Sequence, residues 1–199
     1  MSESIPVIVL AAGGSTRTKS PKQLFRFEEE TLLRRAVGTA LDSRCAPVHV
    51  VLGSDAERFA PELTGLPVHV TVNREWEEGI GSSIRSGLRA ATVRNAEMTA
   101  AVFMTVDQPF VTPGILDRLV GVFLDRRPPI VACAYDDTVG TPALFDLALF
   151  ESLRSLEGDT GAKLIILQQG DAVVTIDAPE VGIDIDTEED LRRLQQSNQ

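Results

Sequence analysis

Short apolar runs alternate with more polar stretches along the chain, and this pattern sets the expected elements. Six runs have the length of buried strands, at residues 5–10, 48–53, 68–72, 100–106, 130–135 and 172–177. The stretches between them carry helical patterns, at residues 31–43, 55–63, 82–92, 114–123 and 164–168. Strands that alternate with helices predict an α/β fold: a three-layer, doubly wound, mostly parallel sheet with one antiparallel strand late in the chain.

The first apolar run leads directly into a glycine turn. Gly13 and Gly14 follow the run, and the cations Arg17, Lys19 and Lys22 come next. A buried strand that ends in glycines places backbone N–H groups at the carboxyl edge of the sheet, where open α/β sheets bind ligands. Arg and Lys side chains just beyond can neutralise phosphate oxygens. This loop is therefore predicted to hold a nucleoside triphosphate.

Known phosphate-loop patterns fit this stretch only in part. The dinucleotide fingerprint fails, because Ser15 and Thr18 stand where its second and third glycines belong. The P-loop pattern matches at Gly13, Lys19 and Ser20, but Thr18 replaces its second glycine. A strand-to-helix connection without a ligand is the third alternative. From the residues alone, all three remain open.

A carboxylate follows the most apolar run. Residues 100–106 read as a central strand, and Asp107 comes directly after them, at the same sheet edge as the glycine turn. Mg²⁺ bound to phosphates takes only one or two protein carboxylates, so Asp107 is the first candidate metal ligand. The alternative is a cap for the helix that begins near Pro113.

The last apolar stretch carries two more candidate ligands. Acidic and apolar residues alternate over 183–186, which points Asp184 and Asp186 to the same side if the segment is extended. Thr187 with Asp190 forms a variant of the capping box for a final helix.

Composition limits the function classes. The chain has 199 residues, consistent with a single domain over residues 1–199, and a net charge of −10. An acidic protein repels nucleic acid and anionic membranes, so neither is expected as a partner. The first residues lack a basic, signal-like segment, and Cys45 and Cys133 are too far apart for a disulfide framework. These features favour a cytoplasmic protein with reduced, buried thiols. His49 and His69 lack ligand-spaced neighbours and are expected as ordinary strand residues.

Two ordered motifs resemble the MobA-like nucleotidyltransferases, most closely the molybdenum cofactor cytidylyltransferase branch. The first is Leu-Ala-Ala-Gly-x-Ser-x-Arg-x-x-x-Pro-Lys, from Leu10 to Lys22. The second is Trp-x-x-Gly-x-Gly-Ser-Ser-x-Arg-x-Gly-Leu, from Trp76 to Leu88. Three shorter segments also match, around Asp107, at residues 140–145 and at residues 158–163. The chain departs from the family at Thr18-Lys19, where Met-Gly is usual, and at Thr141, where His is frequent.

The resemblance implies a Rossmann-like nucleotide-diphospho-sugar transferase fold and a role for each matched residue. Arg17, Lys22 and Asp107 would be catalytic, and Asp107 with Asp184, in preference to Asp186, would bind Mg²⁺. The implied nucleotide contacts are Leu10, Ala11, Ala12, Gly13, Gly14, Ser15, Lys22, Gly81, Ser82 and Ser83. The implied acceptor contacts are Gly140, Thr141, Asp159 and Lys163. Trp76 is expected to pack rather than to stack on the ligand.

The resemblance also implies the reaction. CMP would pass from CTP to the phosphate of a molybdopterin-type cofactor with release of pyrophosphate, and Ala12 favours CTP over GTP. The absence of a legible Ser-His-Asp or Cys-His arrangement agrees, because a phosphate acceptor is already ionised and needs no general base. A molybdoenzyme or its chaperone is a candidate partner, and a monomer or weak dimer is expected. The alternatives are a GTP or other-acceptor transferase, a P-loop ATPase or kinase, and a non-catalytic or redox-type ligand-binding relative.

Overall fold

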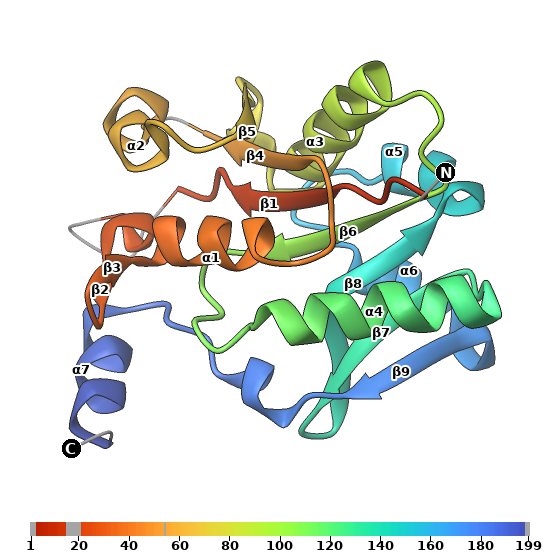
Figure 1. Ribbon diagram of the computed structural model, residues 1–199. Helices are drawn as coiled ribbons and strands as arrows, with labels where there is room; N and C mark the ends of the chain where they lie inside the picture. The colour runs from red at the N-terminus through yellow and green to blue at the C-terminus, as the bar shows by residue number, and fades with distance from the viewer. Residues whose placement is uncertain (1–2, 15–20, 54, 198–199) are drawn as a thin grey trace.

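A seven-stranded sheet organises the protein in the computed structural model, which describes residues 3–14, 21–53 and 55–197 (Figure 1). The strand order is β5-β4-β1-β6-β8-β7-β9. Only β8 runs antiparallel to its neighbours β6 and β7, while the other paired strands are parallel. The strands are β1 (Val7–Ala11), β4 (Val48–Leu52), β5 (Val68–Val72), β6 (Ala100–Thr105), β7 (Ile130–Tyr135), β8 (Thr138–Asp146) and β9 (Val173–Asp177). The predicted α/β class and the late antiparallel strand are confirmed.

Helices cover both faces of the sheet and give three layers. One face packs against α1 and α4, which lie in front of the sheet in Figure 1, and the other packs against α3, α5 and α6. The helices are α1 (Leu32–Leu41), α2 (Ala56–Leu63), α3 (Ile80–Arg94), α4 (Pro113–Arg126), α5 (Phe150–Arg154), α6 (Lys163–Gln169) and α7 (Glu188–Ser197). None of the helices in the described part of the chain combines the length and apolar character that a membrane crossing needs.

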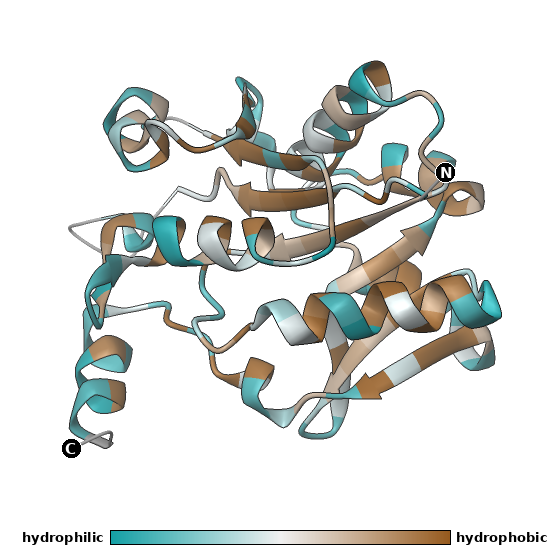
Figure 2. Ribbon diagram, viewed as in Figure 1, coloured by the Kyte–Doolittle hydropathy of each residue, from teal (hydrophilic) through white to brown (hydrophobic). Residues whose placement is uncertain are grey.

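Burial on both faces explains why β1 is apolar at every position and its neighbours β4 and β6 at nearly every one. In β1, Val7 and Val9 belong to the core under α1 and α4, whereas Ile8 and Leu10 belong to the core under α3. All five residues of β1 are buried, and the same continuous hydrophobic colour runs along the middle strands in Figure 2. Parallel strands covered by helices on both sides need this pattern. Cys45 and Cys133 are free and buried, as predicted, and burial raises the pKa of their thiols to about 11 and about 12.

Some boundaries differ from those expected. Helix α3 begins at Ile80, ahead of the predicted Ser82, because the chain turns at Gly79 with a φ of +118°. Helix α5 and a small hairpin of β2 (Arg26–Phe27) and β3 (Glu30–Thr31) were not predicted. Residues 183–186 form no strand. Their predicted alternation holds only from Asp184 on, since Ile185 is fully buried between the exposed Asp184 and Asp186, whereas Ile183 is exposed too.

A small third core attaches the C-terminal helix to the rest of the fold. Ile185 packs with Phe25, Phe27 and Leu32, and Leu191 and Leu194 of α7 complete the cluster. The capping box at Thr187 is present: the Asp190 N–H donates to Thr187 Oγ1, and the Thr187 N–H donates to Asp190 Oδ2 at 2.9 Å. The cluster brings residues 184–186 to the carboxyl edge of the sheet, beside the end of β6.

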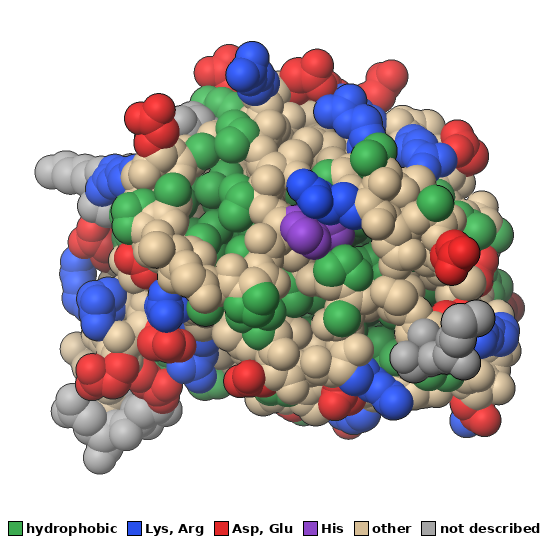
Figure 3. Space-filling model, turned by 45° about the horizontal axis from the view of Figure 1, so that its top comes forward, with side chains coloured by type: hydrophobic (Ala, Val, Ile, Leu, Met, Phe, Trp, Pro, Cys, Tyr) green, Lys and Arg blue, Asp and Glu red, His purple; other side chains and the backbone are tan. Residues whose placement is uncertain are grey.

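The two histidines face each other across β4 and β5. His49 pairs with His69 in register, their ring centroids lie 5.1 Å apart, and His49 is 1% exposed. Neither ring nitrogen of His49 has a hydrogen-bond partner among the residues that the structure describes. Histidine atoms that reach the surface lie next to a basic side chain (Figure 3). Burial, with the nearby charges of His69 and Arg94, lowers the pKa of His49 to about 4.

This buried imidazole predicts a loss of stability in acid. The unfolded chain binds a proton at His49 below a pKa near 6.5, but the folded protein resists it down to about 4. The cost is absent above pH 6.5 and grows as the pH falls towards 4, where it reaches about 3 kcal/mol. Denaturant unfolding of the wild type and of His49→Leu at pH 7 and pH 4 measures it. The wild type should lose more stability than the variant, and equal losses would contradict the assignment.

Candidate nucleotide-binding site

A cavity of about 400 Å³ opens at the carboxyl edge of the sheet. Strands β1 and β6 are hydrogen-bonded neighbours, so the glycine turn after β1 and Asp107 after β6 reach the same place. Residues 10–14, Lys22 and Asp107 line the cavity together with Trp76 and Ser83. Residues far apart in sequence therefore surround a space within the size range of small-molecule sites.

Gln23 holds the glycine turn in shape. Its side chain is 1% exposed, and its Nε2 donates to the carbonyl of Ala11 at 3.0 Å and to that of Gly13 at 2.7 Å. One carboxamide thus fixes the backbone on both sides of Ala12. Sequence reasoning gave Gln23 no role, although its position next to Lys22 in the loop was the available signal.

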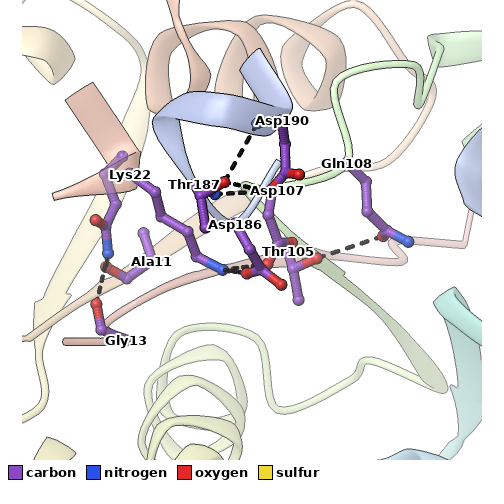
Figure 4. Close-up of polar contacts among 10 residues, drawn as sticks. Ala11, Gly13, Lys22, Thr105, Asp107, Gln108, Asp186, Thr187 and Asp190 are labelled. Atoms are coloured by element: carbon purple, nitrogen blue, oxygen red, sulfur yellow. Dashed lines mark hydrogen bonds and ion pairs between the residues drawn. The ribbon is translucent and has the colours of Figure 1, made fainter. Parts of the chain in front are cut away.

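Lys22 joins two carboxylates at the mouth of the cavity. Its Nζ donates to Asp107 Oδ2 at 2.6 Å and to Asp186 Oδ1 at 2.7 Å, as the dashed lines in Figure 4 show. Burial opposes the charge on the ammonium group, but the charges and hydrogen bonds of Asp107 and Asp186 outweigh it and raise the pKa of Lys22. Lys22 is therefore a permanent cation between two anions.

Asp184 lies in the same electrostatic cluster. Desolvation, followed by the charges of Asp107 and Asp186, raises the pKa of Asp184 to about 6. The segment is fixed there because the Ile185 N–H donates to the carbonyl of Asp107 at 2.8 Å. Asp186, which the sequence analysis ranked below Asp184, makes the direct contact to Lys22. The two aspartates thus both face Asp107, and neither lines the cavity itself.

The turn before α3 forms another part of the cavity wall. Asn73 is 4% exposed, and its Nδ2 donates to Ser82 Oγ at 2.8 Å and Ser83 Oγ at 3.1 Å. Ser82 Oγ also donates to the carbonyl of Gly79 at 2.8 Å. Of the predicted contacts at the start of α3, Ser83 lines the cavity, whereas Gly81 and Ser82 do not. Asn73, at the end of β5, is a second residue that sequence reasoning missed.

Trp76 both packs and faces the cavity. Its ring lies so close to Gly14 that a Cβ on Gly14 would come within 2.4 Å of Trp76 Cζ3. The indole also packs against the core under α3. A side chain at position 14 would collide with the ring, so this contact requires glycine there. The packing role predicted for Trp76 is present, and the ring is also part of the wall.

The donor set fits a divalent cation only together with phosphate oxygens. In the described part of the chain, no group of three or more His, Cys, Asp or Glu is placed to hold a metal ion by itself. Asp107 and Asp186, however, already bind one cation, the Lys22 ammonium, within 2.7 Å. Mg²⁺ that is held by triphosphates takes one or two carboxylates, so this arrangement suits a metal that arrives with the nucleotide.

The remaining predicted residues lie in different places. Of the acceptor contacts, only Asp159 lines the cavity. The Thr141 carbonyl accepts from Gln108 Nε2 at 3.1 Å, Gly140 packs against the Tyr135 hydroxyl, and Lys163 is exposed at the start of α6. Ser15 and Arg17 lie outside the described residues, and so do Thr18 and Lys19.

The fold and this site define a class: nucleotidyltransferases with a Rossmann-like α/β architecture. The model of the MobA-like NTP transferase domain matches residues 7–173. The chain belongs to this family.

The chain is similar to a curated protein and to solved structures. Nicotine blue oxidoreductase of Paenarthrobacter nicotinovorans is 31% identical and is matched over 94% of each chain. The crystal structure of Rv0371c from Mycobacterium tuberculosis H37Rv has a TM-score of 0.84 at 29% identity, covering 98% of this chain and 100% of that one. A structure of Rv0371c in complex with manganese has a TM-score of 0.76 at 28% identity, with 98% and 100% coverage.

Proposed function

We propose that the protein transfers CMP from CTP to the phosphate of a molybdopterin-type cofactor and releases pyrophosphate in a Mg²⁺-dependent reaction. The carrying observation is the Lys22 ammonium held between Asp107 and Asp186 at the rim of the cavity formed by the glycine turn. The ammonium offers a cation to phosphate oxygens, and the carboxylates offer oxygen ligands to a divalent metal that arrives with a triphosphate, in a chain whose net charge is −10.

We propose a task for each part of the site. An oxygen of the acceptor phosphate attacks the α-phosphorus, a new P–O bond forms, and the bond to the β-phosphate breaks. Lys22 and backbone N–H groups near Gly13 and Gly14 stabilise the charge on the phosphates. Asp107 and Asp184 would hold Mg²⁺, which neutralises the charge that develops on the triphosphate. Arg17 remains a predicted phosphate ligand.

The proposed metal and the proposed acceptor contacts have different support. The manganese complex of Rv0371c shows that a protein similar to this chain binds a divalent metal. Lys163, Gly140 and Thr141 remain proposed acceptor contacts, because they match family motifs. The alternative within the family is a transferase that uses GTP as the donor or a different phosphorylated molecule as the acceptor. The relative named nicotine blue oxidoreductase favours, as a second candidate, an oxidation–reduction reaction in the same cavity.

A pyrophosphate-release assay tests the proposal. Each of the four NTPs is combined with Mg²⁺ and a panel of phosphorylated acceptors that includes molybdopterin. We expect pyrophosphate in equal amount to the CMP transferred, with CTP as the best donor. Formation of a nucleoside diphosphate would indicate a kinase or ATPase. In a separate assay with an added hydride donor, reduction of nicotine blue without nucleotide transfer would favour the second candidate.

A further inference from the structure

The lining of the cavity is chemically divided. Lys22 supplies a cation where it pairs with Asp107, whereas Ile80 and the Trp76 ring, which packs on Gly14, supply apolar surface. The phosphates of a nucleotide belong with the cation, and its base belongs with the apolar side chains. The proposed triphosphate can therefore be accommodated in one direction.

Asp159 lies on the apolar side of this division. Its Oδ1 is so close to Gly79 that a Cβ on Gly79 would come within 2.6 Å of it, and Gly79 adjoins Ile80. Asp159 is exposed and lines the cavity, while Lys22 makes its ion pairs to Asp107 and Asp186. Because its neighbours Gly79 and Ile80 carry no charge, the Asp159 carboxylate is suited to a part of the ligand that carries N–H donors.

Contacts between distant segments fix Asp159 in place. The Gly81 N–H donates to the carbonyl of Gly158 at 3.0 Å, and the Arg85 guanidinium donates to the carbonyl of Leu156. The same guanidinium pairs with Glu78 Oε2 at 2.7 Å. Because Gly79 has no Cβ, the 158–159 backbone can lie directly on the turn. The carboxylate therefore belongs to one rigid wall with the start of α3 and does not sit on a free loop.

We propose that Asp159 reads the nucleobase. Its carboxylate accepts a hydrogen bond from the exocyclic amino group of cytosine, although the resemblance implied a role in binding the acceptor. This inference rests on the proposed function. Uracil presents a carbonyl oxygen at the same position, and two acceptors that face each other leave both unpaired in a partly desolvated site. Asp159 thereby selects CTP over UTP.

The replacement Asp159→Asn tests this, because an amide can donate to the uracil carbonyl. Dissociation constants of CTP and UTP are measured in Mg²⁺ without acceptor, by calorimetry and by fluorescence of Trp76, the single tryptophan, which lines the cavity. Wild type should bind CTP at least tenfold more tightly than UTP. The variant should lose at least tenfold of that ratio, partly through tighter binding of UTP.

Glu157→Gln is the matched control. It also removes one negative charge, at a position two residues before Asp159, but the Glu157 side chain does not line this cavity. It should keep the wild-type ratio. If the ratio of the UTP and CTP dissociation constants in Asp159→Asn stays within twofold of wild type, the inference is overturned while the proposed function remains intact. A change confined to the KM of the acceptor would have the same meaning. Failure of the wild type to bind any NTP would overturn both. Thermal unfolding confirms that each variant is folded.

Discussion

Asp107→Asn is expected to lower kcat/KM for nucleotidyl transfer by on the order of a hundredfold or more. Asparagine keeps the shape of the side chain but removes the charge that pairs with Lys22 and would bind Mg²⁺. Neutralisation of the triphosphate accounts for much of the catalysis of such a reaction, so loss of this anchor acts mainly on the transition state. Pyrophosphate release at varied CTP and Mg²⁺ concentrations measures the effect.

Binding data show whether the loss comes from the metal. With CTP present, Mn²⁺ used as a spectroscopic probe should bind Asp107→Asn more weakly than wild type. Asp125→Asn, an exposed position near the far end of α4, removes the same charge and should leave both measurements unchanged. Near-normal turnover in Asp107→Asn would show that the carboxylate serves only the ion pair with Lys22.

The sequence predicts the framework of this protein because the framework depends on local patterns. Continuous apolar runs mark strands that are buried on both faces, and β1 and β6 have this character. The caps Thr31 and Thr187 mark the starts of α1 and α7, where both side chains accept backbone hydrogen bonds. The carboxyl-edge position of Asp107 follows from the strand alone. These signals lie within a few residues of what they predict.

Contacts between distant segments could not be predicted in this way. The link between Lys22 and Asp186 spans 164 residues. It depends on the small core in which Ile185 packs with Phe25, Phe27 and Leu32, and the pattern of residues 183–186 does not say that these are its partners. Gln23 and Asn73 act through carboxamides that bind backbone or hydroxyl groups chosen by the fold. Asp159 enters the cavity only because Gly79 permits the close approach of another loop. For such residues, spacing along the chain carries no information about the partner.

Lys22→Met is expected to separate metal binding from turnover. In the structure, the Lys22 ammonium lies between Asp107, a proposed metal ligand, and Asp186, which is two residues from the other proposed ligand, Asp184 (Figure 4). A metal that binds alone must displace this ammonium from the Asp107 carboxylate, whereas the phosphates of a nucleotide can receive it. The wild type should therefore bind the metal weakly by itself and strongly together with CTP.

Without the ammonium, Asp107, Asp184 and Asp186 repel one another and attract a divalent ion directly. Lys22→Met should thus bind Mn²⁺ alone at least tenfold more tightly than wild type, while its pyrophosphate release falls by on the order of a hundredfold because the phosphates lose their cation. Electron paramagnetic resonance titration of Mn²⁺ with and without CTP measures the first effect. Arg126→Gln, which removes one positive charge at the end of α4, should change neither. Weaker binding of Mn²⁺ by Lys22→Met would mean that Lys22 holds the carboxylates together for the metal and does not compete with it. In Asp107→Asn, by contrast, metal binding and turnover should fall together. The two variants thus distinguish the role of Asp107, which is to bind the metal, from that of Lys22, which is to bind the phosphates.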